Sequence, residues 1–474
     1  MPPTSRTFRA PRGTRDAYPE DALKRRYITQ AWRDASIRHG FDEIEGPTFE
    51  HLELYTQKSG DEIVSQLFSF RREGGDDVYA LRPEFTPTLA RMYAAKANSL
   101  PKPIKWFTAG PYFRAEKTQR GRLREFLQWN CDIMGGCRDV EDRLALDAEM
   151  IGCCLELTRD LGLRSSDVTA LLSDRRIMAA RAKDAGISAD RYQSLMWARD
   201  NQGKLTPAQG QAEFEKRGIT SEDVRLYLEY EKKCNEAHAK RLSDREKVES
   251  IGVPFDLIDQ SVKLQYELDD ACLEGWHQFE AGIVRGLAYY TGMVFEVIAE
   301  GERDVCGGGR YDNLIELFGG PPTPAVGFGM GDVVLSLLLE DKGLMPQGKD
   351  LLEAVSRRQA SARPDAFVIT ADEQFDPIVK RTVATLRAGR ESEAWLERDD
   401  RKPWDADRYS TAPLHARRSY KATRNIGKLL KDATSQHARN AVIIESDEVC
   451  NVKNLDTGEQ RENITLTDLP AHLA

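Results

Sequence analysis

The chain has 474 residues, 40% of them hydrophobic, and carries a formal net charge of -9 at pH 7. That length predicts two or three domains with ample capacity for a core, and no stretch approaches the ~20 apolar residues that a membrane-spanning helix needs. The negative balance excludes a protein that coats nucleic acid by bulk attraction, so any RNA contact must come from local basic patches.

The N-terminal segment and the cysteines indicate the cellular setting. MPPTSRTFRAPRG has no apolar run that could act as a secretory signal, and Asp16, Glu20 and Asp21 closely follow its arginines, which argues against an organelle transit peptide. The eight cysteines form no C-x-x-C pair and lie at no zinc-ligand spacing from a histidine. We therefore expect a cytoplasmic protein with free, mostly buried thiols.

Residues 1–173 mix strand and helix signals in the α+β manner. IKWFTAGPYF and FLQWNCDIMG, at 104–113 and 126–135, predict antiparallel strands, and 140–162 predicts a long amphipathic helix with acids near its start. From 174 to 265 the composition becomes charged and helical, which predicts a helical insertion. Its segment 221–250 opens with SEDV, which resembles a capping box.

Strand signals return in residues 266–345, which we expect to complete the first domain. The end of this region, AVGFGMGDVVLSLLLEDKG, predicts a strand that passes through a glycine-rich turn into a buried helix. Residues 346–364 are polar and predict a linker. In residues 365–474, DAFVIT, a helix at about 376–389 and NAVIIES form a β-α-β pattern, which predicts a small α/β domain.

The two predicted strands at 104–135 flank a basic loop. Arg114 and Glu116 are two residues apart, so strand alternation is expected to put both side chains on one face. The arrangement suits a nucleotide and an amino acid held side by side, although surface hairpins are often basic too. The loop adds Lys117, Arg120, Arg122 and Arg124, and on the return strand Phe126, Gln128, Asn130 and Asp132 share a face.

FRAE, this basic loop and REF resemble motif 2 of the class II aminoacyl-tRNA synthetases, and FLQWNCDIMG is similar to its histidyl-specific version. The resemblance to the histidyl-tRNA synthetase family covers nearly the whole chain in order. It implies an α+β fold with a class II antiparallel sheet flanked by helices, the helical insertion and the C-terminal α/β domain. The other blocks that carry it are GTRDAYPED at 13–21, FDEIEGPTFE at 41–50, LRPEFTPTLARMYA at 81–94, GIVRGLAYYTGMVFEV at 282–297 and CGGGRYDNLIELFGG at 306–320.

The resemblance implies that ATP activates L-histidine as histidyl-adenylate, which is then transferred to the 3′ end of tRNA(His), with Mg²⁺ accompanying the ATP. It implies Arg285 and Arg114 as catalytic residues and predicts no particular metal ligand. A turn at 307–309 is expected to lie close to the ligand, and Arg310 is either structural or ligand-facing. The implied histidine-binding residues are Glu84, Thr86, Arg114, Gln128, Asp132, Arg285, Tyr289 and Tyr290, and the implied ATP-binding residues are Arg114, Glu116, Arg122 and Phe126.

Two partners follow from the same resemblance. The segment 380–431 is rich in lysine and arginine, interleaved with Trp395, Trp404, Tyr409 and Tyr420, which suits a single-stranded anticodon loop. A solvated basic helix is the alternative. Pro47, in the block at 41–50, is tolerated at a sheet edge, and the family's motif 1 implies a homodimer there.

Two positions depart from the family pattern. Val334 lies where an arginine that binds the outer phosphates of ATP is expected, and Ala288 lies where an aspartate is usual. Either Arg122 or Arg310 takes over that contact, or ATP binding is weaker. The alternative function is a synthetase-like paralogue that binds histidine and regulates histidine biosynthesis, but Arg285, the complete hairpin and the C-terminal domain argue against it.

Overall fold

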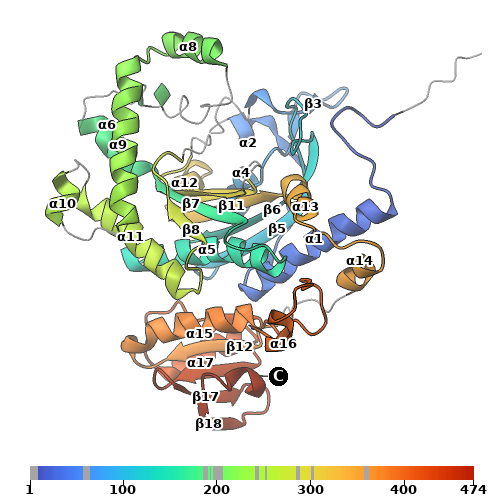
Figure 1. The fold of residues 1–474 in the computed structure, drawn as a ribbon, viewed down its shortest axis with the longest axis vertical. Coiled ribbons are helices and arrows are strands. Elements are labelled where there is room, and N and C mark those ends of the chain that lie inside the picture. Colours follow the sequence, from blue (N-terminus) through green and yellow to red (C-terminus); the bar gives the residue numbers. More distant parts are fainter. Residues whose placement is uncertain are drawn as a thin grey trace, which may run out of the picture.

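An eight-stranded sheet forms the centre of the molecule (Figure 1). The computed structural model describes residues 9–56, 64–184, 191–192, 194–195, 206–240, 245–250, 254–283, 289–299, 304–356, 361 and 363–473. All neighbouring strands from β5 to β7 are antiparallel, and only the outer strands β1 and β8 pair in parallel. The strand order is β1 (Asp42–Glu43), β5 (Ile104–Phe113), β6 (Glu125–Met134), β11 (Ala325–Gly331), β10 (Cys306–Arg310), β9 (Met293–Ala299), β7 (Val168–Asp174) and β8 (His277–Phe279).

The two faces of this sheet bury different cores. On one face Trp129, Cys131 and Ile133 of β6 join the main core with α1 (Pro19–Arg38), α5 (Val140–Asp160), α11 (Phe255–Asp270) and α13 (Asp332–Asp341). On the other face a smaller core contains Phe126 and Met134 of β6 together with α4 (Thr86–Ala94) and α12 (Leu314–Leu317). This alternation follows from the period of two in a strand, and it leaves the polar face of β6 on the side of the smaller core.

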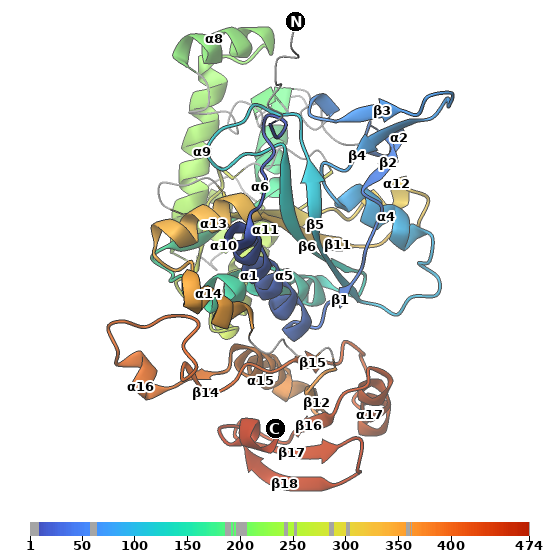
Figure 2. The same cartoon turned by 90° about the vertical axis from the view of Figure 1, so that its right-hand side faces the viewer.

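The predicted helix at 140–162 is confirmed as α5. It begins where the sequence signals place it, because the Asp139 side chain accepts a hydrogen bond from the backbone N–H of Asp142 and acids fill the first turn. A second, three-stranded sheet of β2 (Phe49–His51), β4 (Val78–Leu81) and β3 (Ser69–Arg71) lies beside α4, with α2 (Leu52–Thr56) following β2 (Figure 2).

The described part of the insertion is helical, as predicted. Figure 1 shows α8 and α9 projecting from the body at the end opposite the C-terminal domain. The cap of α9 lies one residue earlier than the sequence indicates: Thr220 Oγ1 accepts from the N–H of Asp223, and Asp223 Oδ2 accepts from the N–H of Thr220. The helices here are α6 (Arg175–Asp184), α8 (Pro207–Lys216), α9 (Ser221–Ala239) and α10 (Arg245–Ser250).

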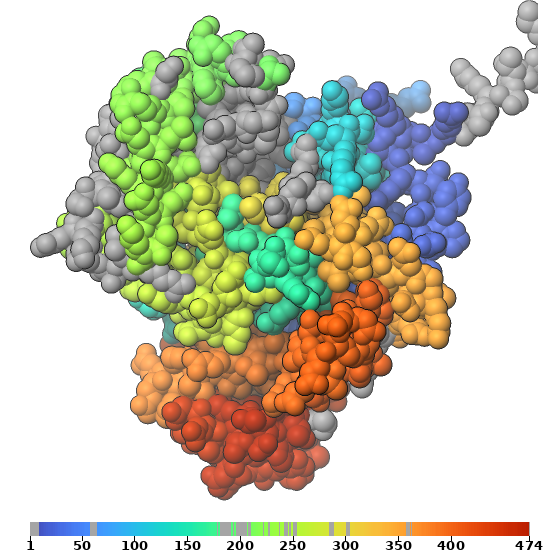
Figure 3. Space-filling view, viewed as in Figure 1, coloured from blue at the N-terminus to red at the C-terminus, as the bar shows by residue number. Residues whose placement is uncertain are grey.

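The C-terminal domain has a five-stranded sheet packed with α15 (Asp376–Ala388) and α17 (Ile426–Ser435), and it lies against the body (Figure 3). β15, β12 and β16 are parallel, which confirms the predicted β-α-β unit. The sheet order is β15 (Ala416–Arg418), β12 (Ala366–Thr370), β16 (Asn440–Ile444), β17 (Val449–Asn454) and β18 (Gln460–Thr465). Short elements are β13 (Arg390–Glu391), β14 (Tyr409–Thr411), α16 (Glu393–Leu396) and two 3₁₀ turns, Glu373–Phe375 and Leu469–His472.

Two local predictions are wrong. The expected linker begins with a helix, α14 (Gly348–Val355), whose Leu351, Ala354 and Val355 are buried in the main core. The expected turn at 307–309 is the middle of strand β10, paired on both sides. A Cβ at Gly308 would lie 2.4 Å from the carbonyl oxygen of Gly327, so these glycines serve the close packing of the sheet. None of the described helices combines the length and apolar character that crossing a bilayer requires.

Candidate active site

The hairpin of β5 and β6 builds one half of the site. The two strands pair from Ile104 opposite Met134 to Phe113 opposite Glu125, so Arg114 and Glu116 follow the strand and do not lie on it. The expectation that strand alternation aligns them is therefore wrong. Arg114 is held by other contacts: its N–H donates to the carbonyl of Arg124 at 2.9 Å and its Nε donates to the carbonyl of Pro83 at 3.0 Å.

A cleft at the end of this hairpin brings together all four residues expected to bind ATP: Arg114, Glu116, Arg122 and Phe126. The guanidinium carbon of Arg114 lies 5.3 Å from the centre of the Phe126 ring, and Arg122 Nη1 lies 2.8 Å from Glu116 Oε2. The opposite side of the cleft comes from the start of β10, the end of β11 and the start of α13. A polyphosphate that entered would compete with Glu116 for the guanidinium of Arg122.

The wall formed by α13 is apolar where a cation was expected. Val333 and Val334 both line the cleft, and Val334 is 8% exposed. Among the described lining residues, Arg114 and Arg122 supply the positive charge, and Glu116 and Asp304 supply the negative charge. Of the two arginines considered as replacements for the missing one, Arg122 therefore lies in the cleft.

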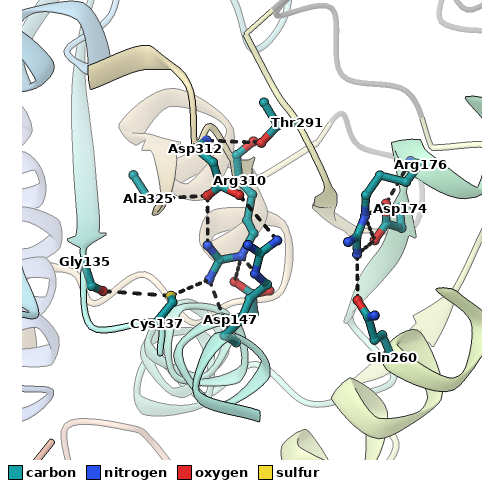
Figure 4. A network of polar contacts seen from close by, with 11 residues as sticks. Gly135, Cys137, Asp147, Asp174, Arg176, Gln260, Thr291, Arg310, Asp312 and Ala325 are labelled. Atoms are coloured by element: carbon teal, nitrogen blue, oxygen red, sulfur yellow. Dashed lines mark hydrogen bonds and ion pairs between the residues drawn. The ribbon is translucent and has the colours of Figure 1, made fainter. Parts of the chain in front are cut away.

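Arg310, the other candidate, is structural (Figure 4). It is 1% exposed, its Nε lies 2.8 Å from Asp147 Oδ1 of α5, and its Nη1 lies 3.1 Å from Asp312 Oδ1. The same Asp312 oxygen accepts from the backbone N–H of Ala325 at 3.0 Å. Removing one partner would leave a buried charge, so Arg310 joins α5 to the sheet and does not replace the missing ATP contact.

A second, more enclosed group of side chains lies along the same face of β6. The Tyr289 hydroxyl donates to Glu84 Oε2 at 2.6 Å, and the Tyr311 hydroxyl donates to Asp132 Oδ1 at 2.5 Å. The Tyr289 ring packs edge-on against Tyr290 and Tyr311, with centroids 5.1 and 6.1 Å apart. Thr86, the first residue of α4, also hydrogen-bonds Tyr289.

Burial controls the electrostatics of this tyrosine and acid cluster. Glu84 and Asp132 are only 5% and 3% exposed. Burial raises the pKa of Asp132 to about 7, reinforced by the charge of Glu84 and opposed by the hydrogen bond from Tyr311. A cation that entered would favour the charged form of both carboxyl groups, so the cluster suits a positively charged or proton-donating ligand.

The expected polar row on β6 is confirmed by these contacts. Gln128 lines the cleft, and the Asn130 amide donates to the Tyr112 hydroxyl at 3.1 Å. Glycines of β11 make room for this row: a Cβ at Gly327 would lie 2.0 Å from Asp132 Oδ1, and one at Gly329 would lie 3.1 Å from Gln128 Nε2. Larger residues there would displace the polar side chains.

Arg285 and Ala288 lie in residues 284–288, outside the described part of the chain. The catalytic role expected for Arg285 beside Arg114 therefore stays a prediction. Sequence reasoning did not assign a role to Tyr311 or Tyr112. Tyr311 directly follows the glycine block of 306–310, and its place beside a predicted ligand segment was the available signal.

Part of the basic segment 380–431 holds the C-terminal domain to the body, and the RNA contact expected for this segment stays a prediction. Lys380 Nζ lies 2.7 Å from Glu267 Oε2 of α11, and Arg387 is buried with Nη1 3.0 Å from Glu149 Oε1 of α5. The Tyr420 hydroxyl donates to Glu149 Oε2 at 2.5 Å. These side chains hold the domain to the body. Arg417 and Arg424 are also ion-paired, Trp395 is buried and donates to Asp405, and Trp404 packs on the main core.

Comparison with known proteins gives one consistent family. A family model described as histidyl-tRNA synthetase matches residues 13–332. The histidine–tRNA ligase of Opitutus terrae is 37% identical over 358 residues, covering 72% of this chain and 76% of that protein. That of Pyrococcus abyssi is 36% identical over 397 residues, covering 81% and 85%. The crystal structure of histidyl-tRNA synthetase from Nostoc sp. PCC 7120 shares the fold, with a TM-score of 0.58 at 22% identity over 98% of this chain and 99% of that one.

Proposed function

The chain belongs to the histidyl-tRNA synthetase family, and we propose that it activates L-histidine with ATP and transfers the histidyl group to the 3′ end of tRNA(His). One observation carries this function beyond the family resemblance. A single face of β6 joins a cleft with two arginines and an aromatic ring, at Phe126, to a buried acidic cluster, at Asp132. The first part suits a nucleotide and the second a small cationic amino acid, so the two reactants would lie end to end.

In the activation step a carboxylate oxygen of histidine attacks the α-phosphorus of ATP, the bond to the β-phosphate oxygen breaks, and pyrophosphate leaves. Two anions must approach, so the task is positioning and neutralisation of charge. We assign the α-phosphate to Arg114, the outer phosphates to Arg122, the adenine ring to Phe126 and its amino group to Glu116. The contact of Arg114 with Phe126 supports this arrangement, because it brings the base and the phosphate clamp within one nucleotide of each other.

We assign the histidine ligand to the tyrosine and acid cluster. Glu84, Thr86 and Gln128 would hold the α-amino group, and Asp132, Tyr289 and Tyr290 would orient and read the imidazole. A site that hydrogen-bonds a side chain rejects analogues that lack the group by large factors, because its own buried polar atoms would be left unpaired. Asp132, with a pKa of about 7, would take its charged form when the ligand brings a positive charge beside it.

The cleft also fits a magnesium ion that enters with ATP. With Glu116 assigned to adenine, the carboxylate of Asp304 also lines it, and one or two carboxylates with phosphate oxygens and waters are the usual ligands of this ion. Within the described residues no group of three His, Cys, Asp or Glu side chains could hold a metal alone. When bound, the ion would supply counter-charge to the phosphates.

Two further expectations belong to this proposal. We propose a homodimer through the segment after Pro47, because Phe49 and Phe70 are 49% and 41% exposed and pack together with Tyr79 as an aromatic surface. We also propose that the protein works in the cytoplasm.

The decisive experiment is pyrophosphate exchange with each amino acid in turn, with and without tRNA. We expect exchange with histidine only. Exchange with a different amino acid would assign another specificity, and tight histidine binding without exchange would favour the regulatory paralogue. Arg285→Ala should then lose exchange by orders of magnitude, about the loss seen when a transition-state charge partner is removed, with little change in thermal stability.

A further inference from the structure

A short N-terminal strap, residues 11–15, lies on the loop end of the β5–β6 hairpin before α1 begins (Figure 2). The N–H of Arg124 donates to the carbonyl of Gly13 at 2.7 Å. Gly13 has a φ of +89°, and a Cβ there would lie 2.7 Å from Thr118 and 2.8 Å from Arg124. Only glycine allows both the backbone conformation and this close approach, so the strap is built to lie on the hairpin.

The strap ends in an ion pair with the wall of the ATP cleft. Arg15 pairs with Asp332, the first residue of α13, whose side chain is completely buried. The other oxygen, Asp332 Oδ1, accepts from the backbone N–H of Leu127 on β6 at 2.9 Å. The ladder between β11 and β6 stops at Gly331 opposite Gln128. The Asp332 side chain therefore replaces the next backbone acceptor, which the turn into α13 takes away.

The contact between Asp332 and Leu127 joins two walls of the cleft that are far apart in the sequence. Leu127 directly follows Phe126, and Asp332 directly precedes Val333 and Val334. Because α13 offers valines to the cleft, its wall can hold a nucleotide only by its shape and its spacing from Phe126. The spacing depends on a buried carboxylate, and a buried carboxylate is stable only when its charge is paired and its oxygens are hydrogen-bonded.

We propose that Arg15 is a positioning residue for ATP: through Asp332 it fixes the Val333 and Val334 wall of α13 against Phe126. This inference rests on the proposed function, since it concerns the nucleotide site of that reaction. A pair that only stabilised the fold would affect both substrates alike, whereas a pair that sets the width of the nucleotide cleft affects ATP selectively.

The test measures the KM for ATP and the KM for histidine separately in pyrophosphate exchange. Arg15→Ala should raise the KM for ATP by about tenfold or more, as expected when a binding wall is misplaced by a fraction of an ångström, and leave the KM for histidine within about twofold. Arg15→Lys, which keeps the charge, should restore much of the loss. Lys24→Ala is the matched control. Lys24 pairs at 3.1 Å with Glu340 of α13, the helix that begins at Asp332, but away from the cleft. The KM for ATP and the KM for histidine should both stay unchanged in this variant.

A second variant keeps the proposal testable if Arg15→Ala proves unstable. Asp332→Asn retains an oxygen for Leu127 and loses the charge, so it should show the same selective rise. The double variant should be no worse than the stronger single one, because both changes break one unit. Equal rises in both KM values, an effect no larger than that of Lys24→Ala, or additive effects in the double variant would overturn the role. Failure of the proposed function is distinct, because the unmodified protein would then show no histidine-dependent exchange.

Discussion

Two regions of this chain both combine basic and aromatic side chains, but these side chains have different surroundings in the structure. Around the β5–β6 hairpin, Arg114 and Arg122 line a cleft beside Phe126. In the C-terminal domain, Arg387 is buried and Tyr420 is partly buried against Glu149 of the body. The sequence suggested phosphate or RNA contacts for both. The difference lies in the acids that each region meets, because α5 and α11 present carboxylates to the C-terminal domain.

The comparison teaches that a basic side chain is available to a ligand only when no neighbouring acid already holds it. Glu149 accepts from Lys105 at 2.7 Å, from Arg387 at 3.0 Å and from Tyr420 at 2.5 Å, and the two cations and the carboxylate are less than 10% exposed. The surrounding cations hold the pKa of Glu149 well below its usual range against the effect of burial. A cluster of this kind fixes a domain orientation, and its arginine has no remaining donor surface to offer to RNA.

The largest expected effect is on the catalytic side. Arg114→Ala should reduce adenylate formation by about 10²- to 10³-fold, because a donor aimed at developing phosphate charge is lost. Arg114→Lys should fall between, since lysine keeps the charge and loses the planar fork. Histidine-dependent pyrophosphate exchange measures both variants, with thermal unfolding as the control for folding. Near-normal exchange in Arg114→Ala would show that the arginine of the hairpin does not serve the reaction.

The next effect concerns stability. Arg387→Ala should lower the free energy of unfolding by about 3 kcal/mol or more, because it removes one of the cations that pair with the buried carboxylate of Glu149. Arg381→Ala on the same helix is the matched control: Arg381 is 57% exposed at the side chain and lies 3.7 Å from Asp270, so its loss should cost less than about 1 kcal/mol. Denaturant unfolding measures both. Equal losses of unfolding free energy in the two variants would show that the buried ion pair does not stabilise the interface more than an exposed one.

The sequence predicted the elements of this molecule well and the partners of its charged residues poorly. The hairpin strands, α5 and the β12–α15–β16 unit follow from local periodicity and capping, which a short window contains. Arg15 and Asp332 pair across 317 positions, and no local pattern records such a contact. The same limit explains Arg310, whose burial depends on Asp147 of α5. The glycines of β10 looked like a turn because their requirement for close strand packing is also non-local.

A pH dependence of stability, intermediate in size, tests the same interface between the C-terminal domain and the body. His39 is buried between Glu156 and Arg387: its Nδ1 accepts from Arg387 Nη1 at 3.3 Å, so Nε2 carries the proton that is donated to Glu156 at 2.8 Å. Burial lowers the pKa of His39 to about 4, with the charges of Arg387 and Lys105 reinforcing the shift and Glu156 opposing it. A proton on Nδ1 would face the guanidinium of Arg387.

The lowered pKa of His39 determines whether stability rises or falls with pH. The unfolded chain takes up a proton at His39 near its ordinary pKa of about 6.5, whereas the folded chain resists it down to about 4. The stabilisation is complete above pH 6.5 and is lost as the pH falls toward 4. Between pH 7 and pH 5 we expect His39 alone to lower the free energy of unfolding by about 2 kcal/mol. His39→Asn should flatten the profile by about this amount, and an unchanged slope would contradict the assignment.

The smallest expected effect tests which C-terminal cations remain available to RNA. Lys428 and Lys431 of α17 are exposed, and within the described residues no acid forms an ion pair with them. Because each exposed lysine contributes one phosphate contact at most, the double alanine variant should raise the KM for tRNA by only about threefold to tenfold and weaken its salt dependence. Adenylate formation and stability should not change.

Lys421→Ala supplies the matched control for this last effect. Lys421 lies in the same domain and its side chain is 56% exposed, but its Nζ lies 2.8 Å from Asp432 Oδ1. If pairing with an acid decides availability, the KM for tRNA should change less in this variant than in the Lys428 and Lys431 double variant. Aminoacylation at two salt concentrations measures both. An equal or larger effect from Lys421→Ala would mean that exposed ion pairs open readily for phosphate, and that only the buried pairs, such as Arg387 with Glu149, separate the two regions.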